Sequence, residues 1–366
     1  MSLVKGIHHV TVCVSGAQED IDFQTKVLGQ RMIKQTILFD GRYAHYHLYF
    51  SNADCDPGSV YTTFPYKRIH GRPGTGQLQA TSYSVPKGSI KFWVEHLNRH
   101  DITHTGIQER FGQSFIRLNH PSGIQVEVLE DDNDHRNGWT TDQISSDVTT
   151  RGFHDAVVSV REVAETERFF VDALGFRKTG QDGAYHRFEV GIGGPAKTVI
   201  LQHEPDRPAG SWTFGSGTAH HLALQIDSDE ELAQQKGIYD ELGYTDCSEI
   251  KDRQYFHSVY CRAPGGILIE CAASVPLSFA VDEPSDQLGT HLLLPPWFEA
   301  RREEIQKMLE PIQVPEGNIP KEMPKVVAPP PTVSPDSTAE QAPGGILTPS
   351  RRTAAIFVGG DAETDK

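Results

Sequence analysis

Two His-His pairs introduce two stretches of alternating side chains that lie more than two hundred residues apart. The first pair, His8-His9, begins HHVTVCV, and the second, His220-His221, begins HHLALQI. A buried acid is expected at Glu270, in the similar stretch ILIECA. Two imidazoles and one carboxylate on one side of a divalent ion leave its other side open. This arrangement suits Fe(II) enzymes that bind O2 and a substrate side by side, and Zn(II) accepts the same ligand types.

The alternation of side chains along a strand selects one histidine of each pair as a ligand. We predict that three residues hold the ion: His9, His221 and Glu270. Thr11 should share the face of His9. The other members of the pairs, His8 and His220, should face away from the ion and either support the site from behind or line a neighbouring part of the pocket.

These stretches belong to a repeat of about 70 residues. Four units each combine an alternating stretch, an amphipathic segment and further alternating stretches. The amphipathic segments predict helices that begin near four residues: Ala17, Ser89, Glu162 and Asp229. Three of them end in VLGQR, ALGFR and ELGYT, where the glycine is the expected left-handed residue after a helix. The fold class is therefore α+β, with four βαβββ modules whose paired curved sheets enclose cavities that can hold a metal.

Pairing of the units decides where ligands meet. The first strands offer at one equivalent place His9, Ala80, Asp155 and His221, and the last strands offer at another Thr63, Glu127, Gln202 and Glu270, with a loose register in the third unit. A cavity between the first and fourth units collects both imidazoles, the Glu270 carboxylate and Thr63. A cavity between the second and third units contains no imidazole from these places, so only the first pairing yields a ligand set.

The bulk composition excludes some partners. Among 366 residues, 49 acidic and 34 basic side chains give a net charge of −15, which argues against nucleic acid or an anionic membrane as a partner. No apolar run reaches the ~20 residues that a membrane span needs. The N-terminus lacks the pattern of a secretory signal, and the five cysteines are scattered, so we expect a reduced, cytoplasmic protein.

The chain divides into three parts by composition. We expect an N-terminal pair of modules over residues 5–140 and a C-terminal pair with a terminal helix over residues 150–312. Residues 313–366 are rich in Pro and Ser with few aromatic residues, which predicts a disordered tail. A weaker metal candidate is the pair His45 and His47 in YAHYHLYF, but a half-exposed strand is the more common meaning of that spacing.

Several segments resemble a known family. They are HHVTVC, DIDFQTKVLGQRMIKQT, YHLYF, PGSVYTTFP, EVLEDDND, RGFHDAVVSV, HEPDRPAGSWTFGSGTAHH and YFHSVYCRAPGGILIE. They resemble the vicinal-oxygen-chelate superfamily, which includes glyoxalases, bleomycin-resistance proteins and extradiol dioxygenases. Within it, the resemblance is to dioxygenases that cleave the ring of hydroquinones and chlorohydroquinones. It covers residues 5–312 and leaves the Pro-rich tail outside.

The resemblance implies an Fe(II) held by two His and one Glu, which are here His9, His221 and Glu270, although Mn(II) fits the same ligands. It implies a surrounding set of functional residues: His8, Thr11, His220, Arg253 and Tyr260. In this set Arg253 would offset charge on a bound phenolate or superoxide, and Tyr260 would donate a proton. The substrates would be a small aromatic diol and O2, and the oligomeric state, including a homo-oligomer, stays open.

Two rival functions belong to the same superfamily. A glyoxalase-type isomerase or lyase normally takes a fourth protein ligand from the paired unit, where this chain has Thr63. A binding protein of the bleomycin-resistance type needs no metal, and the complete ligand set argues against it.

Overall fold

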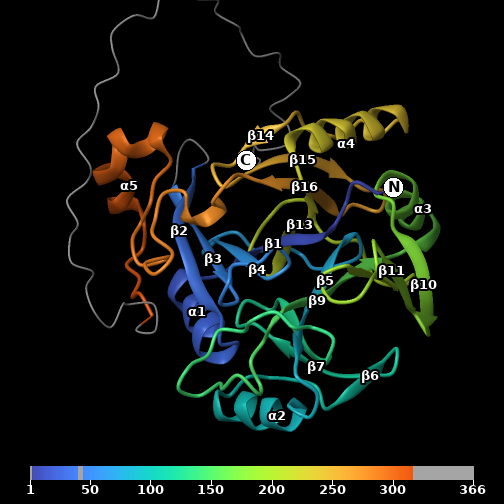
Figure 1. The fold of residues 1–366 in the computed structure, drawn as a ribbon, viewed down its shortest axis with the longest axis horizontal. Coiled ribbons are helices and arrows are strands. Elements are labelled where there is room, and N and C mark those ends of the chain that lie inside the picture. Colours follow the sequence, from blue (N-terminus) through green and yellow to red (C-terminus); the bar gives the residue numbers. More distant parts are fainter. Residues whose placement is uncertain (1, 40–43, 316–366) are drawn as a thin grey trace, which may run out of the picture. The chain divides into compact units, whose positions relative to one another are not determined.

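Four βαβββ units follow one another in the computed structural model (Figure 1), which describes residues 2–39 and 44–315. The first comprises β1 (Gly6–Val14), α1 (Ala17–Asp22), the π-helical turn η1 (Phe23–Val27), β2 (Arg31–Phe39), β3 (Ala44–Ser51) and β4 (Val60–Pro65). The second comprises β5 (Gln77–Val85), α2 (Ile90–Arg99), β6 (Gln108–Arg110), β7 (Gln113–Asn119) and β8 (Gln125–Glu130).

The other two units have the same composition. The third comprises β9 (Gly152–Val160), α3 (Val163–Arg168), the π-helical turn η2 (Phe169–Ala173), β10 (Arg177–Asp182), β11 (Tyr185–Glu189) and β12 (Thr198–His203). The fourth comprises β13 (Thr218–Ile226), α4 (Asp229–Glu241), β14 (Lys251–Asp252), β15 (Phe256–Arg262) and β16 (Leu268–Ser274). All four helices begin at the predicted residue or one residue later.

Glycines terminate three of these helices as predicted. Gly29, Gly175 and Gly243 have φ angles of 66°, 71° and 80°, a left-handed conformation that a side chain disfavours. The chain can therefore reverse direction there and start the next strand.

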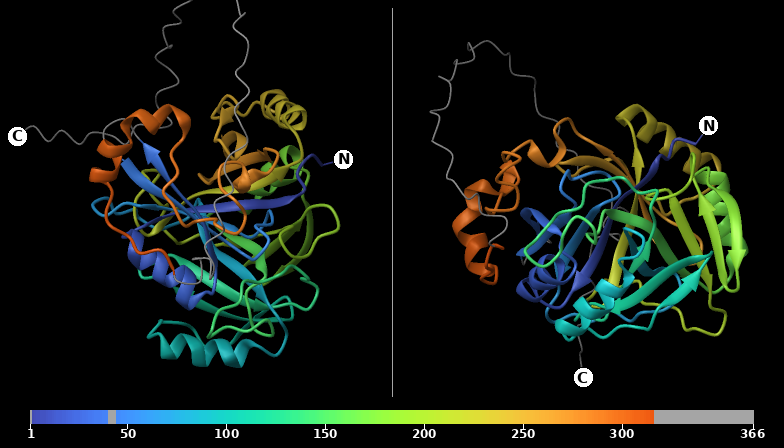
Figure 2. Two further views of the ribbon diagram at one scale, coloured as in Figure 1. Left: turned by 60° about the vertical axis from the view of Figure 1, so that its left-hand side comes forward. Right: turned by 60° about the horizontal axis from the view of Figure 1, so that its bottom comes forward.

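The strands form two curled eight-stranded sheets, each shared by two units (Figures 1 and 2). The order in the first sheet is β14-β15-β16-β13-β1-β4-β3-β2, and in the second it is β10-β11-β12-β9-β5-β8-β7-β6. The first unit thus pairs with the fourth, and the second with the third. This confirms the predicted fold class and the pairing that brings the two His-His pairs onto adjacent strands.

The central strand β1 is buried on both faces. Val10 and Val12 point into the main hydrophobic core, which also contains Val126 and Val128 from β8 of the other sheet. The alternate residues His9 and Thr11 face the opposite side, toward β13 and β4. Strand alternation therefore separates a packed apolar face from a polar face at the centre of the first sheet.

A segment after β16 returns to the first unit (Figure 2). It contains the 3-10 helices η3 (Ser278–Ala280) and η4 (Pro296–Arg301) and helix α5 (Arg302–Met308), so the predicted terminal helix is present. The Leu293 amide donates a hydrogen bond of 2.9 Å to the Gln35 carbonyl of β2. The described residues belong to one compact unit, Met1–Ile319. The predicted disordered tail lies, from residue 316 on, outside the described residues.

Among the described residues, no helix combines the length and the apolar character that a membrane span requires.

Candidate metal centre

Three ligand atoms converge on three adjacent strands: Nε2 of His9 on β1, Nε2 of His221 on β13 and Oε2 of Glu270 on β16. The two imidazole nitrogens are 3.0 Å apart. The carboxylate oxygen is 2.7 Å from His221 Nε2 and 3.4 Å from His9 Nε2. All three side chains are buried. The sequence prediction of this set is therefore matched by a cluster in which one ion can touch all three groups.

The two oxygens of the Glu270 carboxylate differ in their contacts, and one of them is available to bind a cation. Oε1 accepts a hydrogen bond from Ser258, whereas the buried Oε2 has no hydrogen bond of acceptable geometry, although two imidazoles lie close to it. Burial opposes ionisation, but the His221 and His9 rings hold the pKa of Glu270 well below its usual range. An ionised, unsatisfied oxygen beside two imidazole nitrogens is a donor set that fits a divalent metal ion.

The first histidine of each pair, which is not a ligand, supports the ligand that follows it. His8 Nδ1 lies 2.8 Å from His9 Nδ1, and His220 Nδ1 lies 2.8 Å from His221 Nδ1. His8 and His220 are the unpaired extra residues where the β1–β13 pairing shifts register. Strict alternation would turn them to the opposite face, but such a bulge re-aims side chains. Each pair of rings therefore stays in contact on one side of the sheet.

These contacts fix the direction of the ligand rings. Because Nδ1 of each ligand is hydrogen-bonded to a neighbour, Nε2 is the nitrogen left for the ion. Burial lowers the pKa of His8 to about 3 and that of His220 well below its usual value, so both neighbours are neutral. His8 is itself held by Ser274 Oγ at 2.8 Å, and His220 stacks on Phe214 with ring centroids 3.7 Å apart.

We expect that alanine at His8 or His220 weakens metal binding by about 10–100-fold without removing it, because the ligand ring loses its orienting hydrogen bond. Titration of the apo-protein with a divalent ion measures this change. The exposed His135, changed to alanine, is the control and should leave affinity unaltered. Equal affinity in all four proteins would show that the neighbours do not orient the ligands.

The place of a fourth protein ligand needs a correction of one residue. Glu270 pairs with Ala223, two residues after His221, and by the same offset the first unit supplies Thr62, which pairs with Thr11. The prediction of Thr63 is wrong because this residue lies on the other face, where it donates a hydrogen bond of 2.6 Å to Asp20. In the third unit the same offset gives Ile200, the partner of Val157, in place of Gln202.

The fourth place therefore holds a hydroxyl and no carboxylate. Thr62 Oγ1 is 2.7 Å from Thr11 Oγ1, which is 2.8 Å from His221 Nε2. His47 Nε2 lies 3.0 Å from Thr62 Oγ1, and Tyr49 OH lies 3.0 Å from His47 Nδ1. His47 is thus a site residue that its spacing from His45 did not reveal, since only the register of β3 against β4 brings it here.

Arg253 and Tyr260 lie at the edge of the centre. Tyr260 on β15 pairs with Glu270 on β16, and Arg253 Nε donates a hydrogen bond of 3.2 Å to Tyr260 OH. Burial and the Glu270 charge raise the pKa of Tyr260, against the opposing effect of Arg253, so its hydroxyl stays protonated at neutral pH. A guanidinium and a protonated phenol thus lie next to the carboxylate of the centre.

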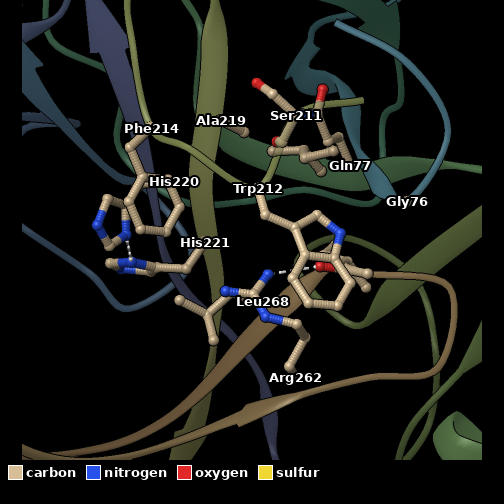
Figure 3. A pocket seen from close by; sticks show the side chains of 13 residues that line it. Gly76, Gln77, Ser211, Trp212, Phe214, Ala219, His220, His221, Arg262 and Leu268 are labelled. Carbon is tan, nitrogen blue, oxygen red and sulfur yellow. Dashed lines mark hydrogen bonds between the residues drawn. The ribbon is translucent and has the colours of Figure 1, made fainter. Parts of the chain in front are cut away.

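A pocket reaches the ligand His221 from the surface (Figure 3). It lies between the chain before β13 and the turn that joins β15 to β16. The Arg262 guanidinium lies 4.9 Å from the ring centre of Trp212, and Phe214 stacks on His220 in the wall of the same pocket. Its wall includes Gln77, Trp212, Phe214, His221, Arg262 and Leu268.

Known proteins are similar to this chain in sequence. A family model described as the Glyoxalase/Bleomycin resistance protein/Dioxygenase superfamily matches residues 152–271. The chlorohydroquinone/hydroquinone 1,2-dioxygenase of Sphingobium indicum is 38% identical over 316 residues, which cover 85% of this chain and 98% of that protein. MhqO of Bacillus subtilis strain 168, which is named as a ring-cleaving dioxygenase, is 35% identical over 310 residues, 84% of this chain and 97% of the relative.

Solved structures of other proteins have a similar fold. A crystal structure of a Bacillus subtilis protein described as a dioxygenase superposes with a TM-score of 0.81 at 34% identity and covers 86% of this chain and 100% of that one. Glyoxalase I from Zea mays shares the fold at 13% identity, with a TM-score of 0.53 over 73% of this chain and 92% of that one. The chain therefore belongs to the ring-cleaving dioxygenase family of the glyoxalase/bleomycin resistance/dioxygenase superfamily, whose fold is the vicinal-oxygen-chelate fold.

Proposed function

We propose that the protein is an Fe(II)-dependent dioxygenase that uses O2 to cleave the ring of a hydroquinone-type diol. The observation that carries the proposal is the buried set of two imidazoles and one carboxylate, with Thr62 and no second carboxylate at the place of a fourth protein ligand. Three protein ligands on one side leave neighbouring positions for two further molecules. The relative from Sphingobium indicum, named for chlorohydroquinone and hydroquinone, supports the choice of substrate class.

His9, His221 and Glu270 would hold the ion. When bound, Fe(II) supplies the electron transfer between the aromatic ring and O2, and Mn(II) fits the same donors. The hydroxyls of a hydroquinone are para to each other, so only one of them can lie at the centre. His8 and His220 keep the ligand imidazoles in position while the substrate binds.

The remaining residues act on charge and protons. Arg253 places a positive charge beside the position of an ionised substrate hydroxyl, in a buried setting where charge interactions are stronger than in water. Tyr260 keeps its proton at neutral pH and is placed to donate it to an oxygen atom during ring opening. Phe256, with its ring 5.0 Å from His9, covers the centre with apolar surface.

Oxygen uptake tests the proposal. Protein purified without air and loaded with Fe(II) should consume one O2 for each hydroquinone molecule, and a panel of chlorohydroquinones and catechols then ranks the accepted substituents. A parallel sample loaded with Mn(II) identifies the working ion. Absence of uptake with every diphenol would refute the dioxygenase. Isomerisation of a thiol adduct without O2 would favour a glyoxalase-type reaction, and tight ligand binding without turnover or metal would favour a binding protein.

Tyr260→Phe should lower kcat about 100-fold while metal content stays unchanged, because the variant loses its proton and keeps its ring. Arg253→Met should lower kcat by about 100–1,000-fold, since the developing negative charge loses its nearest cation. Stopped-flow measurement of ring cleavage under saturating O2 separates kcat from KM. Tyr244→Phe, at the end of α4, is the control. A change in KM alone would assign both residues to substrate binding and not to the chemical step.

A further inference from the structure

We propose that the second sheet contains a converted metal site, in which the guanidinium of Arg110 takes the place that the ion has in the first. The same register offsets apply in both sheets. Glu127 on β8 pairs with Ser82, two residues after Ala80, as Glu270 pairs with Ala223, two residues after His221. Asp155 is the fourth residue of β9, as His9 is the fourth residue of β1. The second cavity therefore keeps a carboxylate at Glu127 and gains another at Asp155.

One nitrogen joins these two carboxylates. Arg110 Nη2 lies 2.9 Å from Glu127 Oε2 and 3.3 Å from Asp155 Oδ1. Ser82 Oγ lies 2.6 Å and 2.7 Å from the same two oxygens. Arg110, Glu127 and Asp155 are 2%, 0% and 1% exposed, so the positive charge is as buried as an ion would be. One cationic nitrogen therefore lies between two carboxylate oxygens, at the repeat positions whose counterparts in the first sheet surround the metal centre.

Aromatic rings hold the guanidinium at this point. Arg110 ends the edge strand β6, and the turn through Phe111 and Gly112, with φ angles of 52° and 75°, leads into β7. The guanidinium carbon lies 4.8 Å from the ring centre of Phe115 and 5.1 Å from that of Tyr185. Tyr185 belongs to β11, on the far side of the same sheet. The side chain thus crosses the cavity instead of pointing to solvent.

Arg110 is the repeat counterpart of Arg253. Arg117 pairs with Glu127 as Tyr260 pairs with Glu270. Arg110 and Arg253 each stand seven residues before that partner, and each is followed by a residue with positive φ, 52° at Phe111 and 67° at Gln254. One position in the repeat therefore supplies a cation to both cavities. Beside the metal centre it remains at the edge, and in the second cavity it occupies the middle.

The histidine that supports a ligand in the first sheet also has a counterpart in the second sheet. His154 is the extra residue in the β9–β5 pairing, as His8 is in the β1–β13 pairing. Its Nδ1 lies 2.8 Å from Asp155 Oδ2 and its Nε2 lies 3.1 Å from Asp131 Oδ2. Burial lowers the pKa of His154, but Asp131 and Asp155 raise it to about 9.

The charges in this cavity balance. The cations are Arg110, Arg117 and protonated His154, and the anions are Glu127, Asp131 and Asp155. A divalent ion added to this set would be a buried, uncompensated charge, which is strongly unfavourable. Wild-type protein should therefore bind one ion per chain, at the first centre alone.

Mn(II) binding measured by equilibrium dialysis tests this inference. Arg110→Ala should bind one ion more than wild type, whereas Arg110→Lys, which keeps the charge, should bind no extra ion. Glu127→Gln in the Arg110→Ala background should abolish the added site. Arg187→Ala, which removes a more exposed guanidinium next to Phe111, is the control and should match wild type. Because the test compares the number of Mn(II) ions bound by the variant and by wild type, its result does not depend on whether the first centre uses Fe(II).

Two further measurements allow for poor folding of the variant. Arg110→Ala should melt at a lower Tm, and Mn(II) should raise that Tm by more than it raises the Tm of wild type, whereas in the Arg110→Ala/Glu127→Gln protein the rise should equal that of wild type. Glu270→Ala with Arg110 intact should bind no Mn(II). Equal stoichiometry in Arg110→Ala and wild type, or an ion retained by Glu270→Ala, would overturn the proposal.

Discussion

Replacing Glu270 by alanine should remove the bound metal ion and reduce oxygen uptake to background. Glu270 is the only charged member of the three ligands, and its Oε2 lies within 3.4 Å of both ligand imidazoles. Two neutral imidazoles alone hold a divalent ion weakly, and redox turnover requires the ion. His9→Ala and His221→Ala remove one ligand each and should also lose the ion during dialysis.

Metal analysis after anaerobic purification and dialysis measures this loss, with circular dichroism as a check of folding. Glu270→Gln keeps the shape of the side chain and should bind the ion more weakly than wild type but more tightly than Glu270→Ala. Glu299→Ala, on the surface helix η4, is the matched control for loss of one acid. Unchanged metal content in the three alanine variants would refute the site.

The ligand set is predictable from the sequence because the repeat is visible in the periodicity of its side chains. Four alternating stretches with helices between them require four similar units, and the His-His pairs occur in the first and fourth. The pairing follows from ligand chemistry, since no other pair of units offers two imidazoles at equivalent places. His9, His221 and Glu270 are thus predictable from the sequence alone, and their three ligand atoms converge in the structure.

The two incorrect predictions, Thr63 and Gln202, have a common physical origin in strand register. A shift of one residue turns every side chain to the other face, and Thr62 and Thr63 are indistinguishable by type. The bulges at His8 and His220 depend on how β1 and β13 pair, so alternation alone could not place those rings beside the ligands. Arg110 reaches its cavity from an edge strand of three residues, and no local pattern marks that path.

A second large effect is expected from Lys34→Ala, which should lower the free energy of unfolding by about 3–5 kcal/mol, because it leaves a buried acid without its partner. Lys34 on β2 is 0% exposed. Its Nζ lies 2.8 Å from Asp282 Oδ1 and 3.1 Å from Glu283 Oε2. Both acids belong to the segment that returns from β16, so this lysine fastens that segment to the first unit.

Urea unfolding of matched variants separates this buried pair from an ordinary surface pair. Lys236→Ala breaks a pair between the 24% exposed Lys236 and the 59% exposed Asp240 and should change stability by only about 0.2–1 kcal/mol. Changing Glu283 to Gln in the Lys34→Ala background should recover part of the loss, since the uncompensated charge is then removed. If Lys34→Ala and Lys236→Ala were equally stable, the returning segment would be held by its apolar contacts, such as Phe279 with Tyr255, and the buried charge would be incidental. A large difference in stability between the two variants would instead show that the buried charge holds this segment in place. The segment lies close to the metal centre, because its Phe279 packs beside Tyr49 and Phe256.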